Sequence, residues 1–180
     1  GRFPNLVTMF FRRAEELGDR PFLWAKRKAG WESISWREAA GQVAELAQSL
    51  RTMGLVPGDR VMLVSENRPE WCIADLAIMA AGCVTVPTYT TNTERDHQHI
   101  LDNSGARAVI VSDLKLAKAL LPAVLRATAA NFVIGMESLR VGQASHYRVY
   151  NWHELITGDP AKRKAAIEAV SKEAEKLQRD

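Results

Sequence analysis

Residues 67–91 read NRPEWCIADLAIMAAGCVTVPTYTT, and this stretch decides the fold class that we predict for the chain. Residues 69–81 are apolar on almost every side, which predicts a buried helix that is capped by Asn67 and stopped by the following glycine. Residues 83–86 form a short continuous apolar run, typical of a strand covered on both faces. The stretch therefore predicts one helix and one strand of an α/β fold.

The same rhythm continues on both sides of this stretch. Short apolar runs predict further strands, and segments with apolar residues at helical spacing predict helices between them. We expect strands at 61–64, 108–111 and 132–136, and helices at 36–53, 93–103 and 115–130, the last kinked or broken at Pro122. Such alternation favours a mostly parallel sheet with covering helices, joined by right-handed crossovers.

The two ends of the chain are predicted to carry smaller elements. Residues 5–17 have one apolar face and predict a helix, and residues 22–25 and 31–34 predict a small hairpin near the N-terminus. Residues 137–148 are irregular and are interpreted as loop or edge structure. We expect 1–180 to be a single subdomain, with a compact α/β part at 1–158 and a peripheral charged helix at 159–180.

Composition excludes several classes of protein. The chain has 180 residues, with 24 Lys and Arg against 21 Asp and Glu, so its net charge of +3 gives no reason to expect nucleic-acid binding. No apolar run is long enough for a membrane span. Cys72 and Cys83 lie in apolar surroundings and are interpreted as buried free thiols, which indicates a reducing, cytoplasmic location. The basic run 26–28 is interpreted as a solvated hairpin tip, with a phosphate or membrane contact as the alternative.

Most motifs that carry chemistry are absent from the sequence. It contains neither glycine-rich phosphate loop, Gly-x-x-x-x-Gly-Lys-Ser/Thr or Gly-x-Gly-x-x-Gly, and no Gly-x-Ser-x-Gly nucleophile turn. His97 and His99 are two positions apart on a predicted helix, so we expect separate surface side chains and no metal site. Asp113 follows a strand, where ligands bind in open α/β sheets, although a helix cap is the commoner explanation. The hydroxyl-rich loop 88–93 also follows a strand and is a candidate to face a ligand.

Several motifs occur together in the order and spacing of one known family. Residues 67–71 read Asn-Arg-Pro-Glu-Trp, and residues 81–87 read Ala-Gly-Cys-Val-Thr-Val-Pro. Residues 54–61 contain Gly-x-x-x-Gly-Asp-x-Val, and residues 34–38 read Ile-Ser-Trp-Arg-Glu. Together they resemble the N-terminal part of adenylate-forming, AMP-binding acyl-CoA synthetases, especially the long-chain fatty-acid–CoA ligase type. The resemblance implies the N-terminal subdomain of the adenylate-forming enzyme fold.

The resemblance implies an ATP-dependent acid–thiol ligase. Such enzymes use ATP and Mg²⁺ to convert a carboxylic acid to an acyl-adenylate, which coenzyme A then converts to a thioester. The family's phosphate loop, its adenine and Mg²⁺ motifs and its C-terminal domain with the catalytic lysine have no counterpart in these 180 residues. We therefore expect an inactive fragment of a longer enzyme, with no catalytic residue, no metal ligand and no bound cofactor of its own.

Two places in the chain are expected to approach coenzyme A in the intact enzyme. The resemblance puts Tyr89, Thr90 and Thr91 near the path of coenzyme A, and Lys115 and Lys118 are point charges that suit one of its phosphates. The partners implied are the remainder of the same chain, a fatty acid and coenzyme A, with peripheral membrane association and a homodimer left open. The alternatives are a stand-alone interaction or regulatory module of the same descent and a flavodoxin-like nucleotide-binding domain.

Overall fold

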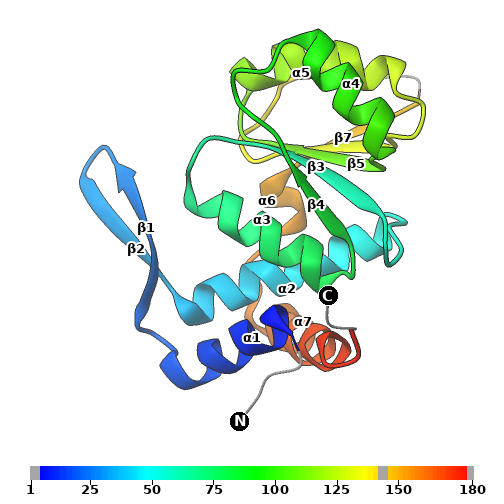
Figure 1. Ribbon diagram of the computed structural model, residues 1–180. Coiled ribbons are helices and arrows are strands. Elements are labelled where there is room, and N and C mark those ends of the chain that lie inside the picture. The colour runs from blue at the N-terminus through cyan, green and yellow to red at the C-terminus, as the bar shows by residue number, and fades with distance from the viewer. Residues whose placement is uncertain (1–4, 142–145, 178–180) are drawn as a thin grey trace. The chain divides into compact units, whose positions relative to one another are not determined.

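The computed structural model describes residues 5–141 and 146–177, and contacts within it define two compact units (Figure 1). Unit 1 consists of the segments Gly1–Val56, Arg68–Gly82 and Ile156–Asp180. Unit 2 consists of Pro57–Asn67 and Cys83–Leu155. Unit 1 is thus assembled from three separate stretches of sequence. This division differs from the predicted split at residue 158, because the C-terminal helix belongs with the N-terminal helices.

Unit 2 contains the predicted parallel sheet. Its strands lie in the order β4-β3-β5-β6-β7, and every neighbouring pair is parallel. The strands are β3 (Arg60–Val64), β4 (Val84–Pro87), β5 (Ala108–Val111), β6 (Phe132–Gly135) and β7 (Arg148–Asn151). The sequence predicted the first four. Strand β7 lies at the sheet edge and carries exposed or half-buried side chains, so it lacks the apolar run that identified the others.

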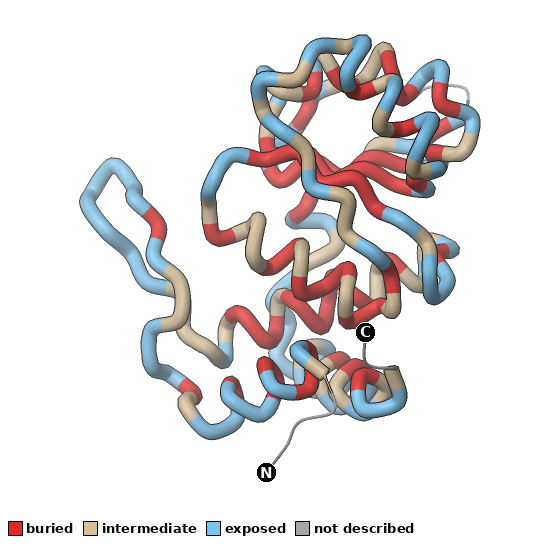
Figure 2. Tube along the Cα trace, viewed as in Figure 1, coloured by how far each residue is buried: buried red, intermediate tan, exposed pale blue. Residues whose placement is uncertain are grey.

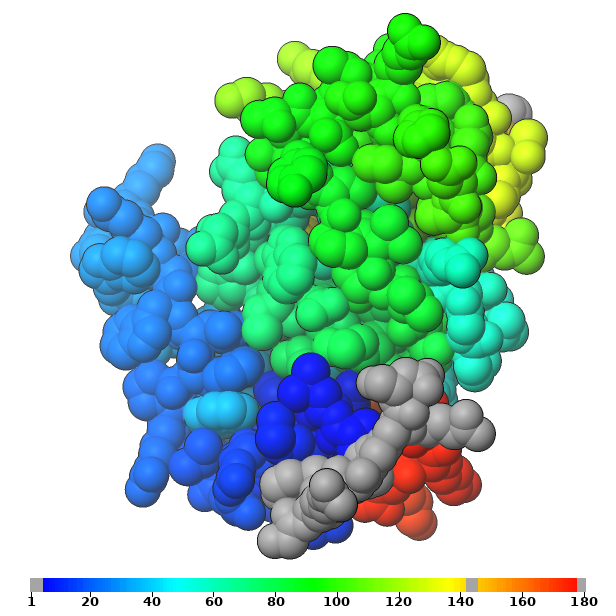
Figure 3. Space-filling view, viewed as in Figure 1, coloured from blue at the N-terminus to red at the C-terminus, as the bar shows by residue number. Residues whose placement is uncertain are grey.

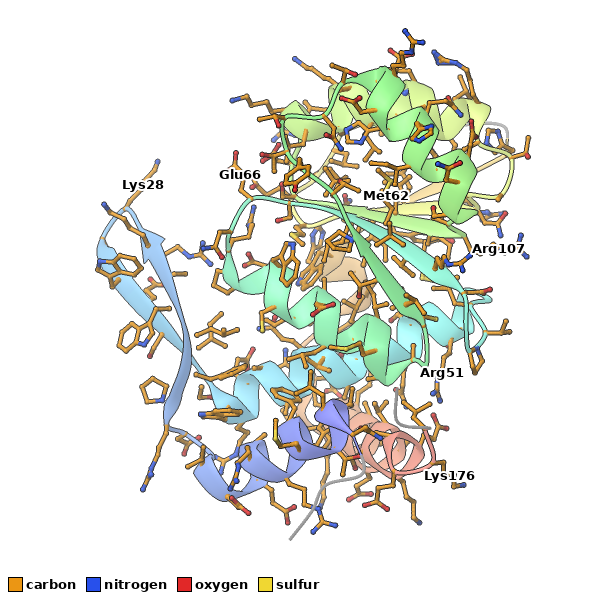
Figure 4. The ribbon with its side chains drawn as sticks, in the orientation of Figure 1. Lys28, Arg51, Met62, Glu66, Arg107 and Lys176 are labelled. Atoms are coloured by element: carbon orange, nitrogen blue, oxygen red, sulfur yellow. The ribbon has the colours of Figure 1, made fainter. Side chains whose placement is uncertain are left out.

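The core of unit 2 lies between the sheet and two helices, α4 (Glu94–Ser104) and α5 (Leu114–Arg126), which pack against each other. Met62, labelled in Figure 4, is fully buried in this core. Alternate residues of the central strands point into the core, as the two-residue period of a strand requires. Of the predicted kink or break at Pro122, the break does not occur, because helix α5 continues through this residue. The core strand residues are Met62, Val64, Val109, Val111 and Val133.

Unit 1 is built around helix α2 (Trp36–Thr52), which contacts helices α1 (Leu6–Leu17), α3 (Pro69–Ala80) and α7 (Pro160–Ala174). Figure 2 shows α2 buried along most of its length. Its contact surfaces are rich in small residues, which allow helices to approach closely: Ala39, Ala40, Gly41, Ala44 and Ala47 are all buried. The predicted cap of α2 is confirmed, since the Ser35 hydroxyl accepts a hydrogen bond from the Glu38 amide at 3.0 Å.

The start of α3 differs from the prediction. Arg68, not Asn67, occupies the N-cap position, and its side chain makes no capping hydrogen bond. The Arg68 guanidinium instead donates to the carboxylate of Glu70 at 2.5 Å. Pro69 occupies the first turn, where a missing N–H has no cost, so the helix begins without a side-chain cap.

Helix α7 was predicted to be peripheral, but it packs along α2 and buries its narrow apolar stripe completely. Ala166, Val170 and Ala174 are at most 1% exposed. Asp159 caps the helix by accepting from the Lys162 amide at 2.9 Å. Three small or β-branched residues are enough for a tight contact, because the facing surface of α2 is also made of small residues.

The structure confirms the predicted hairpin and the free thiols. Strands β1 (Pro21–Arg27) and β2 (Gly30–Ser35) pair antiparallel in unit 1. Neither cysteine forms a disulfide; Cys83 is buried as predicted, but Cys72 is only half-buried. Burial and the nearby Asp75 carboxylate raise the pKa of the Cys72 thiol. None of the described helices is both long and apolar enough to span a membrane.

Candidate functional site

The carboxyl edge of the sheet in unit 2 gathers polar residues from three strands. Ser65 follows β3, Thr88 follows β4 and Ser112 follows β5. Because all the strands are parallel, these residues leave the sheet at the same edge. Glu66, labelled in Figure 4, marks this edge, and Arg107, just before β5, marks the opposite one. Ligands of open α/β sheets bind at the carboxyl edge.

The strand order places a topological switch point at this edge. The chain passes from β3 to β4 on one side and from β5 to β6 and β7 on the other, so the connections diverge between β3 and β5. The two residues at the divergence are Ser65 and Ser112, which are 8% and 0% exposed. The Ser65 hydroxyl donates to the Glu66 carbonyl at 2.8 Å, and the Ser112 hydroxyl donates to Asp113 at 3.3 Å. Both hydroxyls already have partners inside the fold.

Asp113 serves as the cap of helix α5. Its carboxylate accepts a hydrogen bond from the Leu116 amide at 3.0 Å, one of the first N–H groups of the helix. The commoner explanation given by the sequence for this residue is therefore confirmed. Asp113 holds the start of α5 beside the switch point and so fixes the position of the lysines that follow it.

The predicted residues Tyr89, Thr90 and Thr91 lie in the loop that leaves β4. The Thr88 amide donates to the Leu63 carbonyl at 3.1 Å, which extends the pairing with β3 by one residue. Tyr89 is 79% exposed, so most of its ring faces solvent. The loop ends at a capping box in which Thr93 and Asp96 bond each other's amides at 3.2 and 2.9 Å. Tyr89 is thus a free aromatic side chain on a loop anchored at both ends.

The predicted cations Lys115 and Lys118 lie three positions apart in the first half of α5, and both are exposed. A helix N-terminus disfavours positive charge, so Lys115 does not serve to stabilise the helix. Neither lysine forms an ion pair within residues 5–141 and 146–177. Since β4 and β5 flank β3, the loop after β4 and the start of α5 lie about 10 Å apart at the same edge, which is two strand spacings.

Sequence reasoning was wrong about His97. We expected a surface histidine, but His97 is 2% exposed, and burial lowers the pKa of its imidazole although the Asp96 carboxylate opposes the shift. The missed signal is its four-residue spacing from the buried Leu101, which puts both on the inner face of α4. His99 lies on the outer face and pairs with Asn103 at 2.9 Å, so the expectation that the two histidines diverge is correct.

Buried polar atoms without a hydrogen-bond partner are concentrated in the segment from β4 to the first turns of α4, which crosses the carboxyl edge of the sheet. Among the described residues, five buried side-chain oxygen or nitrogen atoms have no hydrogen-bond partner. Four of them lie within residues 85–98, and a buried polar atom without a partner is costly unless water or a ligand satisfies it. They belong to Thr85, Thr88, His97 and Gln98.

The carboxyl edge carries two exposed lysines and an exposed tyrosine ring. Lysine ammonium groups suit a phosphate, and an exposed tyrosine ring suits a base, whereas the described residues hold no group of three or more His, Cys, Asp or Glu side chains that could bind a metal ion. The glycines with positive φ belong to separate turns and helix ends, and do not form a phosphate-wrapping loop.

Comparison with known proteins gives a family match over nearly the whole chain and relatives over about three fifths of it. The family model described as "AMP-binding enzyme" matches residues 10–174. The chain is 35% identical over 106 residues to the long-chain-fatty-acid–CoA ligase FadD15 of Mycobacterium tuberculosis, covering 59% of this chain and 18% of that protein. It is 36% identical over 116 residues to the human mitochondrial acyl-coenzyme A synthetase ACSM5, covering 62% of this chain and 20% of that protein. The chain thus spans about a fifth of the length of these curated relatives.

Solved structures confirm the fold. A benzoate CoA ligase from Burkholderia xenovorans superposes with a TM-score of 0.69 at 26% identity, over 86% of this chain and 28% of that one. An acetoacetyl-CoA synthetase from Streptomyces lividans gives a TM-score of 0.73 at 23% identity, over 86% of this chain and 25% of that one. The predicted α/β fold, a parallel sheet with helices as in the N-terminal domains of adenylate-forming enzymes, is therefore correct.

Proposed function

Since the chain belongs to the AMP-binding enzyme family, we propose that it forms the N-terminal part of an ATP-dependent acid–thiol ligase. In this reaction a carboxylate attacks ATP, pyrophosphate leaves, and the thiolate of coenzyme A displaces AMP from the acyl-adenylate to give a thioester. The observation that carries the proposal is the family match over residues 10–174. The remaining domains of the same polypeptide are the partners that the reaction requires.

We propose a long-chain fatty acid as the substrate, with the isolated chain inactive. The similarity to FadD15, a long-chain-fatty-acid–CoA ligase, supports this choice. Inactivity is expected because the described residues offer no metal site and no phosphate loop. Acid-dependent exchange between ATP and pyrophosphate tests both points. We expect exchange with long-chain acids from a polypeptide that joins this chain to the later family domains, and none from the 180 residues alone. Exchange that prefers benzoate or a short acid contradicts the long-chain assignment.

We further propose that the carboxyl edge of unit 2 contributes to the coenzyme A site. Lys115 and Lys118 supply positive charge for a phosphate of coenzyme A, and the exposed ring of Tyr89 offers a stacking surface beside the Thr90 and Thr91 hydroxyls. No step of the reaction is assigned to these residues. They bind and orient the thiol substrate while the chemistry takes place elsewhere in the enzyme.

Nuclear magnetic resonance titration of the 180-residue chain with coenzyme A tests this site. We expect amide shifts concentrated in residues 88–91 and 113–118, weakened by Lys115→Ala and by Lys118→Ala. Lys162→Ala is the matched control, because Lys162 is exposed on α7. Weaker binding of dephospho-coenzyme A identifies the 3′-phosphate as the group recognised. Shifts outside these residues, or equal effects of all three substitutions, contradict the assignment without bearing on the proposed reaction.

A further inference from the structure

The hairpin of unit 1 has two exposed tryptophans on one face. The strand register pairs Trp24 with Ser33 and Lys26 with Trp31, and residues directly opposite each other point to the same side of a sheet. Trp24, Lys26, Trp31 and Ser33 therefore share one face, which we call the tryptophan face. Trp24 is 57% exposed and Trp31 is 66% exposed. Figure 2 shows the hairpin as mostly exposed.

The opposite face of the hairpin explains how the hairpin is held. Leu23 and Ile34 are half-buried there and Ala25 is buried, and strand β1 contacts helices α2 and α3 of the same unit. Arg27 lies on this face too, within 3.9 Å of Glu32 and 3.6 Å of Glu70. The packed face thus contains its own apolar anchors and its own ion pairs. The two indoles lie on the other face, where most of their surface is exposed.

The tryptophan face also carries unbalanced positive charge. Lys26 lies between the two indoles in the register, and Lys28 lies in the two-residue turn that joins the strands. Over the described ranges, neither lysine forms an ion pair, and the single acidic residue of the hairpin, Glu32, lies on the packed face. Figure 4 shows Lys28 at the tip, pointing away from the strands. Figure 3 shows the hairpin side chains open to solvent on the viewed side.

We propose that the tryptophan face docks on the surface of an anionic lipid bilayer. Tryptophan has an apolar ring and a polar N–H, and it is enriched at the level of lipid head groups, where both are satisfied. Lysines beside it gain from the negative surface potential of anionic lipids. Two indoles and two lysines on one hairpin match this chemistry, whereas the chain's net charge of +3 is too small to favour nucleic acid. The inference does not depend on the proposed ligase activity.

Sedimentation of the 180-residue chain with lipid vesicles tests the docking. We expect it to pellet with vesicles of phosphatidylcholine and phosphatidylglycerol, and much less with phosphatidylcholine alone or at high salt. Lys26→Glu and Lys28→Glu each lower the partition coefficient about five-fold or more, because each change removes one basic residue from the surface and adds a negative charge. Trp24→Ser with Trp31→Ser lowers it about ten-fold or more, since two large rings leave the interface.

Matched controls distinguish the loss of docking from other causes of weaker vesicle binding. Lys162→Glu and Lys164→Glu make the same change of charge on exposed positions of α7 and should leave vesicle binding unchanged. Unchanged circular dichroism and unfolding midpoint show that the hairpin variants remain folded. The proposal is overturned if the wild-type chain does not pellet with anionic vesicles, or if the tryptophan variant binds like wild type. Binding to oligonucleotides in preference to vesicles, or loss of self-association as the main effect of the variants, also overturns it.

Discussion

Different interactions stabilise unit 2 and unit 1 internally. In unit 2, four apolar strands and two helices succeed one another along the chain, and the core between them is built mainly of apolar side chains. In unit 1, α2 and α7 are joined by a charged network in which the Glu45 carboxylate binds the Arg163 guanidinium at 2.8 Å, although the residues are 118 positions apart. Stabilisation by local apolar runs can be read from a sequence, whereas a distant buried ion pair cannot.

The Glu45 network is nearly complete in hydrogen bonds. Its carboxylate also accepts from the Thr157 amide and hydroxyl at 3.1 and 2.9 Å and from the Gly158 amide at 3.1 Å. Burial alone raises the pKa of Glu45, but Arg163 and the other donors outweigh it, and the net pKa is lowered. The same interactions raise the pKa of Arg163, which also binds Glu38 at 2.5 Å. A satisfied network of this kind makes α7 part of unit 1.

The largest expected effect is a cavity in the core of unit 2. Leu120→Ala should lower the free energy of unfolding by about 4 kcal/mol, because Leu120 is fully buried and its removal leaves a void. Leu125→Ala on the same helix is the control, since Leu125 is 52% exposed and should cost about 0.5 kcal/mol or less. Urea denaturation followed by circular dichroism measures both. Equal effects at the two positions would show that α5 does not pack as described.

The next effect is the loss of the Glu45 partner in unit 1. Arg163→Met should lower the free energy of unfolding by about 3 kcal/mol, because Glu45 is left buried and unpaired. Lys164→Met, an exposed neighbour on α7, should change it little. Adding Glu45→Leu to Arg163→Met should recover part of the loss, since an apolar pair needs no counter-ion. No recovery in a double-mutant cycle would mean that packing of the arginine stem, not the charge, holds α7.

A smaller effect is expected from the cap of α5. Asp113→Ala should cost about 1 kcal/mol of unfolding free energy, because the Leu116 amide loses its acceptor. Asp113→Asn keeps an acceptor at the same place and should restore most of the stability. If Asn fails to do so, the negative charge near Lys115 matters more than the hydrogen bond, and the salt dependence of stability would reveal it.

The smallest effect is a pH dependence that originates in unit 2. The pKa of His97 is lowered from its usual value of 6.5, so the unfolded chain binds a proton there at a higher pH than the folded chain does. Stability from this group is therefore fully present well above pH 6.5, where the unfolded imidazole is neutral too, and falls as the pH drops through 6.5 toward the lowered folded pKa. His97→Gln should flatten the curve, and His99→Gln, on the exposed face, should not. A curve unchanged by His97→Gln contradicts the burial of this side chain.

Most of the sheet and the helices of unit 2 could be predicted from the sequence, because their buried positions are occupied by runs or periodic patterns of apolar residues. The buried strand β5 and the cap Asp113 are examples, since the sequence alone identified both. Strand β7 was missed because it lies at the edge of the sheet, where its residues are exposed or half-buried and form no apolar run. The inward position of His97 was missed because a polar residue was assumed to lie on the outer face of its helix.

The candidate site could be predicted only in part. Sequence order alone placed Tyr89 and Lys115 after strands, and parallel pairing then brought their loops to one edge. The strand order, with β3 between β4 and β5, depends on long-range pairing that no local pattern specifies. The role of Glu45 could not be foreseen either, because its partners come from a segment more than a hundred positions later in the sequence.

The three-segment composition of unit 1 has a consequence for synthesis on the ribosome. Unit 2 is nearly continuous and has all its strands once Leu155 has emerged from the exit tunnel. Unit 1 contains the first 56 residues but cannot close its Glu45 network until Thr157, Gly158 and Arg163 have been translated. Helix α2 must therefore wait, with its small-residue surface partly uncovered, for helix α7, which is translated more than a hundred residues later. A translational pause before residue 156 would prolong that exposure, and nascent chains stalled there are the ones in which we expect chaperone contact.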